Sequence, residues 1–261
     1  KKLKERGYSV SELKLLYPEQ FGKKDDRLLA RQIMQGDVLY LRELLLPRMQ
    51  RKEMGSSFDM PRLTESTQAV ELSGLEKDIY ELLLEEDELN ASQKMQILRQ
   101  FLLNPDIVDP TPRCVGSKIE SADAYLQEQF ASKDKIVMFV NGYIEGVIRR
   151  EHTILDKLHL PPDVSVRVIE GSVKVDDRVA IQRELKESSG KILLVVSGQT
   201  ADVGVDFSAG AGIYFYNEPW NKSGKDQQTS RVYREGLKDD VQATTSIATG
   251  TIEEGIHRYL D

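Results

Sequence analysis

The sequence predicts an α/β fold in which a doubly wound parallel sheet is preceded by a mainly helical segment. From residue 114 onward, short apolar runs rich in Val and Ile alternate with helical stretches, as in KIVMFV followed by GYIEGVIRREHTILDKL. Such strands are typically buried on both faces, and helical crossovers make them parallel. Ligands of such sheets bind beyond the carboxyl ends of the strands, so we expect sites after residues 140, 170, 197 and 217.

The first part of the chain differs in composition. Residues 1–110 are rich in Leu, Glu, Lys and Arg with helical periodicity, and TESTQAVEL alternates polar and apolar residues like a strand. The helix through SQKMQILRQFLL is expected to end at Asn104, because Pro105 disfavours helix in the residue before it. We therefore divide the chain into 1–110, a mainly helical segment with one strand, an insertion and a linker, and 111–261, the sheet domain.

Composition narrows the possible functions. The chain has 261 residues, a net charge of -7 and one cysteine, which predicts no disulfide framework and an intracellular setting. No apolar run approaches the roughly 18 residues that cross a bilayer, so we expect no membrane partner. The histidines lack metal-ligand spacing, which predicts no metal site. The acidic balance argues against coating nucleic acid through bulk charge, although a narrow basic track remains compatible with it.

Motifs of a complete nucleotide enzyme are missing from this sequence. It contains no G-x-x-x-x-G-K-[ST] phosphate loop and no G-x-G-x-x-G fingerprint. The chain also begins KKLKERGYSV, without an initiator Met. We therefore expect a piece of a longer protein that performs no complete reaction alone.

A series of short motifs falls at the expected strand ends. In order they are LRQFLLNP, SKIE, KIVMFVNGY, RVIEGSVKVDDR, LLVVSGQTADVGVDF, YNEPWN, QQTSRVYREG and GTIEE. This order resembles the second RecA-like lobe of Swi/Snf-family ATPases, the DNA-translocating relatives of helicases. The resemblance runs from about residue 40 to the end and implies a RecA-like helicase C-terminal lobe.

The resemblance assigns catalysis to two arginines. Gln227, Arg231 and Arg234 match the family's Q-x-x-x-R-x-x-R-x-G, which implies that both arginines act as fingers on the γ-phosphate of ATP. A guanidinium fork suits the charge that develops during phosphoryl transfer. The spacing of three residues predicts that both lie on one helical face; alone, such a pair would be an ordinary solvated face. Glu235 and Leu237 depart from the family pattern.

The resemblance also implies nucleotide contacts. Gly204 and Asp206 would face the ribose, and Gln227 would contribute to nucleotide binding. Val203 stands where the family has glycine. ATP and Mg²⁺ would be bound mainly by an N-terminal RecA-like lobe of the same parent chain.

Contacts to nucleic acid are implied at the other loops. The residues are Lys118, Asn141, Gly142, Arg178, Ser197 and Thr200. Each has a plainer interpretation. Lys118 would be an exposed lysine in a helix begun by the capping box of Ser117 and Glu120, and Arg178 would be a structural arginine. Asn141 and Gly142 would form a tight turn, and Ser197 and Thr200 would belong to an ordinary glycine-containing loop between a strand and a helix. Trp220 is expected to be mostly a structural anchor.

The function implied is that of the C-terminal lobe of an ATP-dependent translocase or remodeller of double-stranded DNA. It would work in the cytoplasm of a prokaryote or the nucleus of a eukaryote. Two alternatives stay open: a strand-separating helicase of the same superfamily, and a non-catalytic RecA-like binding module. The chain alone is expected not to hydrolyse ATP.

Overall fold

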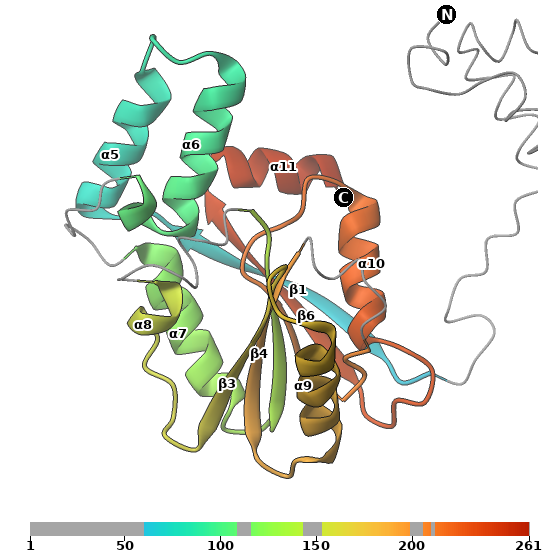
Figure 1. The fold of residues 1–261 in the computed structure, drawn as a ribbon. Helices are drawn as coiled ribbons and strands as arrows, with labels where there is room; N and C mark the ends of the chain where they lie inside the picture. The colour runs from blue at the N-terminus through green and yellow to red at the C-terminus, as the bar shows by residue number, and fades with distance from the viewer. Residues whose placement is uncertain (1–59, 109–115, 143–152, 199–205, 210–211, 261) are drawn as a thin grey trace, which may run out of the picture. The chain divides into compact units, whose positions relative to one another are not determined.

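The computed structural model describes residues 60–108, 116–142, 153–198, 206–209 and 212–260, which form a parallel sheet covered by helices (Figure 1). The strands are β1 (Leu63–Glu71), β2 (Lys135–Val140), β3 (Val164–Ile169), β4 (Lys191–Ser197), β5 (Gly212–Phe215) and β6 (Val241–Thr249). The helices are α5 (Gly74–Glu85), α6 (Ala91–Leu103), the short η4 (Pro105–Ile107), α7 (Ser117–Gln129), α8 (Ile154–Lys157), α9 (Val175–Glu187), α10 (Lys222–Val232) and α11 (Ile252–Leu260).

The six strands lie in the order β1-β6-β5-β2-β4-β3, and all neighbours are parallel. This confirms the predicted fold class. The central strands β2 and β4 consist almost wholly of buried residues, as their unbroken apolar runs predicted. Because all the strands are parallel, their carboxyl ends meet at one edge of the sheet, where the candidate site residues gather.

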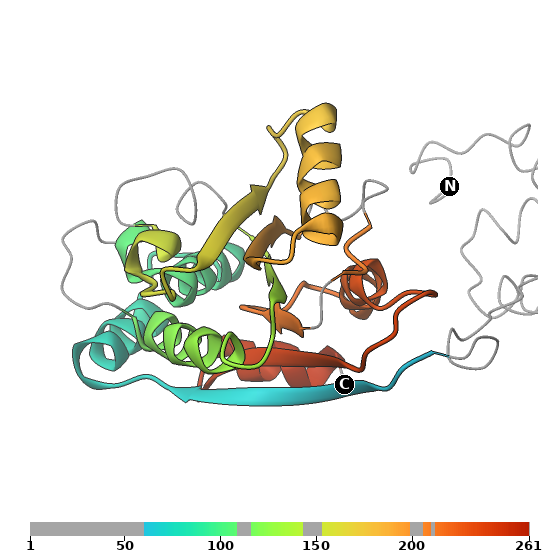
Figure 2. The same cartoon turned by 90° about the horizontal axis from the view of Figure 1, so that it is seen from below.

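Helices cover both faces of the sheet. Ile119 and Leu126 of α7 pack with Met138 on one face, whereas Leu185 of α9 and Val232 of α10 pack on the other. Figure 2 shows the sheet between these two helical layers. The side chains of each strand point alternately to opposite faces, so a strand in this position must be apolar at successive residues.

The strand predicted in the N-terminal segment belongs to the same sheet. β1 pairs with β6 from Leu63 opposite Val241 to Glu71 opposite Thr249. The helices α5 and α6 then pack around Tyr80 and Phe101. The helix α6 ends at Leu103, as predicted from the proline that follows. The domain boundary at residue 110 remains a prediction, and the linker beside it lies mostly outside the described residues.

The start of α7 differs from the expected capping box. Gly116 occupies the N-cap position, and Ser117 is the first residue of the helix. The amide of Ser117 instead donates to Glu76 Oε2 at 2.7 Å, and its hydroxyl donates to the same oxygen. Glu76 is buried, and a buried carboxylate requires such donors. Ser117 therefore links α5 to α7.

Replacing Leu194, which is 0% exposed in β4, by alanine should lower the free energy of unfolding by about 2–5 kcal/mol, because it removes buried methyl groups and leaves a cavity. Chemical denaturation measures this change. The control Leu82→Ala alters a leucine that is 68% exposed and should stay within about 0.5 kcal/mol of the wild type. Equal losses would contradict the assigned core.

Candidate functional site

A cluster of three buried amide side chains joins the strand ends to α10. The backbone N–H of Asn141 donates to Asn217 Oδ1 at 2.7 Å, and Asn141 Nδ2 donates to the Asn217 carbonyl at 2.9 Å. Gln228 of α10 donates through Nε2 to Asn141 Oδ1 at 2.6 Å. We call Asn141, Asn217 and Gln228 the amide cluster. Each of these residues is less than 10% exposed, so the bonds are shielded from water and hold α10 against the ends of β2 and β5.

Two glycines leave room for this cluster. Gly142 has φ +124°, a conformation that favours glycine. At Gly198 a Cβ atom would lie only 1.8 Å from Asn141 Oδ1. The sequence analysis missed Gly198; its position directly after β4, beside the end of β2, was the available signal. Ser197, the last residue of β4, is itself buried.

An open cleft of about 540 Å³ lies beside the amide cluster. It is lined by Arg99, Asn141, Gly142, Gly198, Pro219, Trp220, Asn221, Ser223, Gly224, Gln227 and Gln228. The structure thus brings Asn141, Gly142 and Gln227 together. An adjoining hollow of about 410 Å³ continues along α6. Trp220 is 52% exposed at this cleft, so the expectation of a mainly structural anchor was wrong.

Asp206 and Arg234 lie together near the end of α10. Arg234 Nη1 is 3.9 Å from Asp206 Oδ1, and Lys186 Nζ donates to Asp206 Oδ2 at 2.6 Å. The amide of Phe207 donates to the Arg231 carbonyl at 2.8 Å, which ties this segment to the helix. Burial acts to raise the pKa of Asp206, but the hydrogen bonds from Lys186 and Ser208 outweigh it and lower that pKa.

The two candidate arginines do not share a helical face. The helix α10 ends at Val232, and Tyr233 has an extended backbone with φ −85° and ψ 96°. Arg234 therefore lies beyond the helix. The Tyr233 hydroxyl donates to the Pro61 carbonyl at 2.7 Å, a contact with a distant segment that accompanies this departure from helical geometry.

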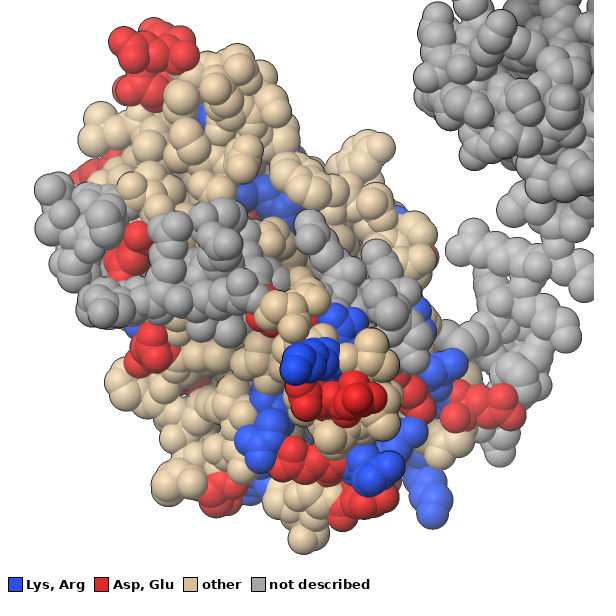
Figure 3. Space-filling view, viewed as in Figure 1, with Lys and Arg blue, Asp and Glu red and all other residues tan. Residues whose placement is uncertain are grey.

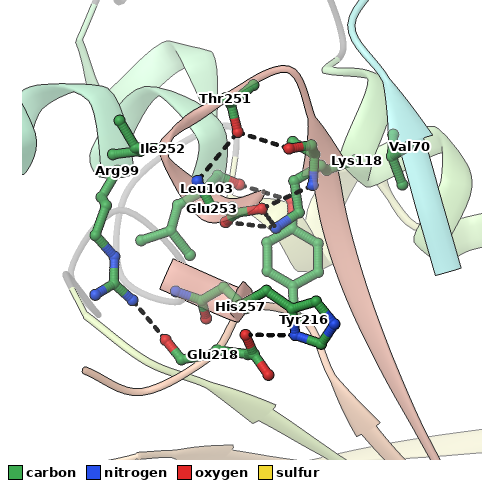
Figure 4. Close-up of polar contacts among 12 residues, drawn as sticks. Val70, Arg99, Leu103, Lys118, Tyr216, Glu218, Thr251, Ile252, Glu253 and His257 are labelled. Carbon is green, nitrogen blue, oxygen red and sulfur yellow. Dashed lines mark hydrogen bonds and ion pairs between the residues drawn. The ribbon is translucent and has the colours of Figure 1, made fainter. Parts of the chain in front are cut away.

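Lys118 is buried rather than exposed. It is 1% exposed, and its Nζ donates to both carboxylate oxygens of Glu253 at 2.7 and 2.6 Å (Figure 4). Desolvation lowers the pKa of Lys118, and the charge of Glu253 opposes that shift. An ammonium group buried in this way does not reach a DNA phosphate. The expectation that Lys118 faces DNA does not fit its position.

The remaining predicted residues fall in two groups. Arg178 donates through Nε to the Val173 carbonyl at 2.9 Å and through Nη2 to the Glu170 carbonyl at 3.1 Å. It therefore holds the turn after β3, which matches its structural interpretation. Thr200 and Gly204 lie outside the described residues.

Positive charge forms no single broad surface on the face shown in Figure 3, where basic and acidic side chains alternate below an acidic tip. Among the described residues, no group of three or more His, Cys, Asp or Glu side chains could hold a metal ion. Over the same ranges, no helix is long and apolar enough to cross a membrane.

Comparison with known proteins agrees with this architecture. Residues 117–236 match the helicase conserved C-terminal domain. The SNF2 domain-containing protein ENL1 of Oryza sativa subsp. japonica is 29% identical over 90 residues, covering 34% of this chain and 9% of that protein. The nuclear protein STH1/NPS1 of Saccharomyces cerevisiae is 22% identical over 245 residues, covering 83% of this chain and 17% of that protein. The chain thus spans less than a fifth of either relative.

Solved structures share the fold. The C-terminal part of the Fun30 ATPase domain superposes with a TM-score of 0.60 at 16% identity, covering 77% of this chain and 90% of that one. The Sulfolobus solfataricus SWI2/SNF2 ATPase core, solved with double-stranded DNA, has a TM-score of 0.61 at 21% identity and covers 84% of this chain and 48% of that one. The fold and the domain match over residues 117–236 are those of a helicase C-terminal lobe. Among such lobes, the chain is similar to those of Swi/Snf-type ATPases.

Gly198→Ala should lower the free energy of unfolding by about 1–3 kcal/mol, because its new methyl group would overlap Asn141 Oδ1 and displace the amide cluster. Gly171→Ala is the matched control, since a Cβ there meets nothing within 4 Å. Denaturant unfolding of both variants makes the comparison. An unaffected Gly198→Ala protein would contradict the close approach at the end of β4.

Glu253→Gln should cost about 3–5 kcal/mol of stability near neutral pH, because it leaves the buried Lys118 ammonium without its counter-ion. Burial lowers the pKa of Lys118. In the folded variant the Lys118 ammonium should therefore lose its proton at a pH at which the unfolded chain still keeps that proton. The deficit should therefore shrink as pH rises toward the usual lysine pKa of about 10.4.

The control for this change is Glu254→Gln. Glu254 makes a 3.6 Å surface pair with Arg258, and such pairs contribute about 0–1 kcal/mol. Unfolding curves recorded across the pH range test both variants. A loss of stability in Glu253→Gln that grew with pH would refute the assigned charge state.

Proposed function

We propose that this chain is the C-terminal lobe of an ATP-dependent translocase or remodeller of double-stranded DNA. The observation that carries this proposal is the position of α10, which joins two sites of different chemistry. At its C-terminal end, Phe207 bonds to Arg231 beside Asp206 and Arg234. Within the helix, Gln228 bonds to Asn141 at the open cleft. A movement of α10 would therefore affect both sites.

The end of α10 fits a nucleotide bound between two lobes. Arg234 is 44% exposed at its side chain, so its guanidinium can approach a phosphate of ATP. Asp206 offers carboxylate oxygens suited to ribose hydroxyls. Arg231 would be the second finger, and Gly204 would be a further contact. Gln227, which the sequence motif assigned to the nucleotide, lines the open cleft. ATP, bound with Mg²⁺ mainly by an N-terminal lobe, supplies the phosphoryl group that is transferred to water.

The cleft fits a nucleic-acid strand. Asn141 and Gly142 line this cleft and would face the sugar-phosphate backbone, and Trp220 would offer a flat ring. Thr200 would be a further contact. Ser197 is 3% exposed in β4 and does not face this surface. Lys118 is not part of this surface, and Arg178 holds the turn after β3 through the Val173 and Glu170 carbonyls. Binding through phosphates would be weakly sequence-specific and sensitive to salt. The related Sulfolobus solfataricus core was solved with double-stranded DNA, which supports duplex DNA as the partner.

A non-catalytic binding module is the second candidate. Asp206 is already engaged by Lys186 at 2.6 Å, and the chain carries a net charge of -7. A strand-separating helicase would use the same residues, and a strand-displacement assay distinguishes it from a translocase. Any of these roles would place the protein inside the cell, in the nucleus of a eukaryote or the cytoplasm of a prokaryote.

Arg234→Ala, made in a parent chain that includes the first lobe, should reduce DNA-stimulated ATP hydrolysis by about 10³- to 10⁵-fold, because an arginine finger stabilises charge in the transition state. Steady-state phosphate release with and without duplex DNA is the measurement. Arg183→Ala is the control, because Arg183 is an exposed arginine of α9 and should leave turnover unchanged.

If the Arg234→Ala variant hydrolysed ATP as fast as the wild type, the assignment of Arg234 as an arginine finger would be rejected. A parent chain with no turnover at all would favour the binding module. The 261-residue chain alone should hydrolyse no ATP above background, and turnover by it would contradict the proposed division of labour between two lobes.

A further inference from the structure

Arg99 of α6 lies directly beneath the exposed tryptophan. Its guanidinium carbon is 3.9 Å from the centroid of the Trp220 ring, and Arg99 itself is 7% exposed. Its Nη2 donates to the Glu218 carbonyl at 2.6 Å (Figure 4). One arginine from outside the matched helicase domain, which begins at residue 117, thus contacts the loop between β5 and α10 at two points.

The same loop is held from its other side. Glu218 accepts a hydrogen bond from Lys225 Nζ at 2.6 Å, and its Oε2 lies 3.1 Å from His257 Nδ1. Glu218 is 4% exposed, so its backbone and its side chain are both held. The Trp220 ring, in contrast, lines the open cleft and stacks on the Arg99 guanidinium. The loop is held at Glu218 by these contacts and presents the Trp220 ring two residues later.

Stability alone does not account for this arrangement. Arg99 Nη1 is buried, and among the described residues it has no hydrogen-bond partner. An unsatisfied buried donor is unfavourable, and an apolar side chain would fill the space without that cost. What only arginine provides here is a planar cation that stacks on the indole while it also donates to a carbonyl.

We infer that Arg99 is a positioning residue, which holds Trp220 in the exposed orientation that stacks against a nucleic-acid strand in the cleft. An exposed aromatic ring is a common platform for bases and sugars. This step rests on the proposed function, because that function supplies the nucleic acid. The holding of Trp220 by Arg99 is a separate claim and can be measured without a ligand. Through Arg99 and Trp220, α6 would contribute indirectly to DNA binding.

Trp220 is the single tryptophan of the 261-residue chain, so its fluorescence reports on this contact alone. The variants are Arg99→Lys, which keeps the charge but loses the plane, and Arg99→Gln, which keeps an amide donor but loses the charge. Arg183→Lys on α9 is the matched control. Thermal melting of each variant shows whether it is folded. Acrylamide quenching and emission anisotropy are recorded without DNA, and the fluorescence change is then followed as duplex DNA is added.

Both Arg99 variants should increase acrylamide quenching and lower anisotropy, because the indole is released from its support. They should also weaken duplex affinity by about 2- to 10-fold. Trp220→Ala should weaken affinity by about 5- to 100-fold, measured with a labelled duplex. In the Trp220→Ala background, Arg99→Lys should have no further effect, because its action passes through the missing ring.

Two results would overturn the inference. Folded Arg99 variants with wild-type quenching and anisotropy would show that Arg99 does not hold the ring. An equal loss of affinity with and without Trp220 would show that Arg99 acts on DNA by another route. If duplex DNA left the wild-type Trp220 fluorescence unchanged and the labelled duplex did not bind, the proposed function would fail. The claim that Trp220 stacks against nucleic acid would fail with it. The holding of Trp220 by Arg99 would then be judged on acrylamide quenching alone.

Discussion

The hydrogen bonds of the amide cluster are the constraint on which the candidate site depends. Asn141 and Asn217 follow two neighbouring parallel strands, and Gln228 brings α10 to the same point. Since these groups are buried, each lost bond would leave a polar group without water. The cluster therefore stabilises the observed arrangement of α10 on the sheet. That arrangement sets where the cleft lies and where Arg234 emerges.

Buried charged side chains fix the packing of the helices at the carboxyl edge of the sheet. Lys118 pairs with Glu253, and the Glu218 carboxylate contacts Lys225 and His257. The Glu218 carbonyl also accepts from Arg99, so these contacts connect α6, α7, α10 and α11. Ion pairs of this kind contribute little net stability because desolvation offsets their attraction, but they tolerate few alternative packings. They make the helices beside the cleft a single unit. A contact made by α6 is thereby transmitted to the loop that carries Trp220.

Much of the fold was predictable because it depends on local composition. The runs KIVMFV and KILLVV form β2 and β4, and α6 ends before Pro105. Local patterns failed where a distant residue competed. Ser117 was expected to cap its own helix, but Gly116 is the N-cap residue, and the Ser117 amide and hydroxyl both donate to the buried carboxylate of Glu76. The helical spacing of Arg231 and Arg234 failed for a similar reason, since α10 ends at Val232.

The sequence by itself determined the order of strands and helices along the chain, the parallel sheet and the resemblance to helicase C-terminal lobes, because apolar periodicity and short motifs depend on neighbouring residues. Only the tertiary structure decided that Lys118 is buried, that Gly198 must lack a side chain and that Trp220 is exposed above Arg99. Those outcomes depend on partners far along the chain; Glu253 is 135 residues from Lys118. Burial and close approach are properties of pairs of segments, and no single segment specifies them.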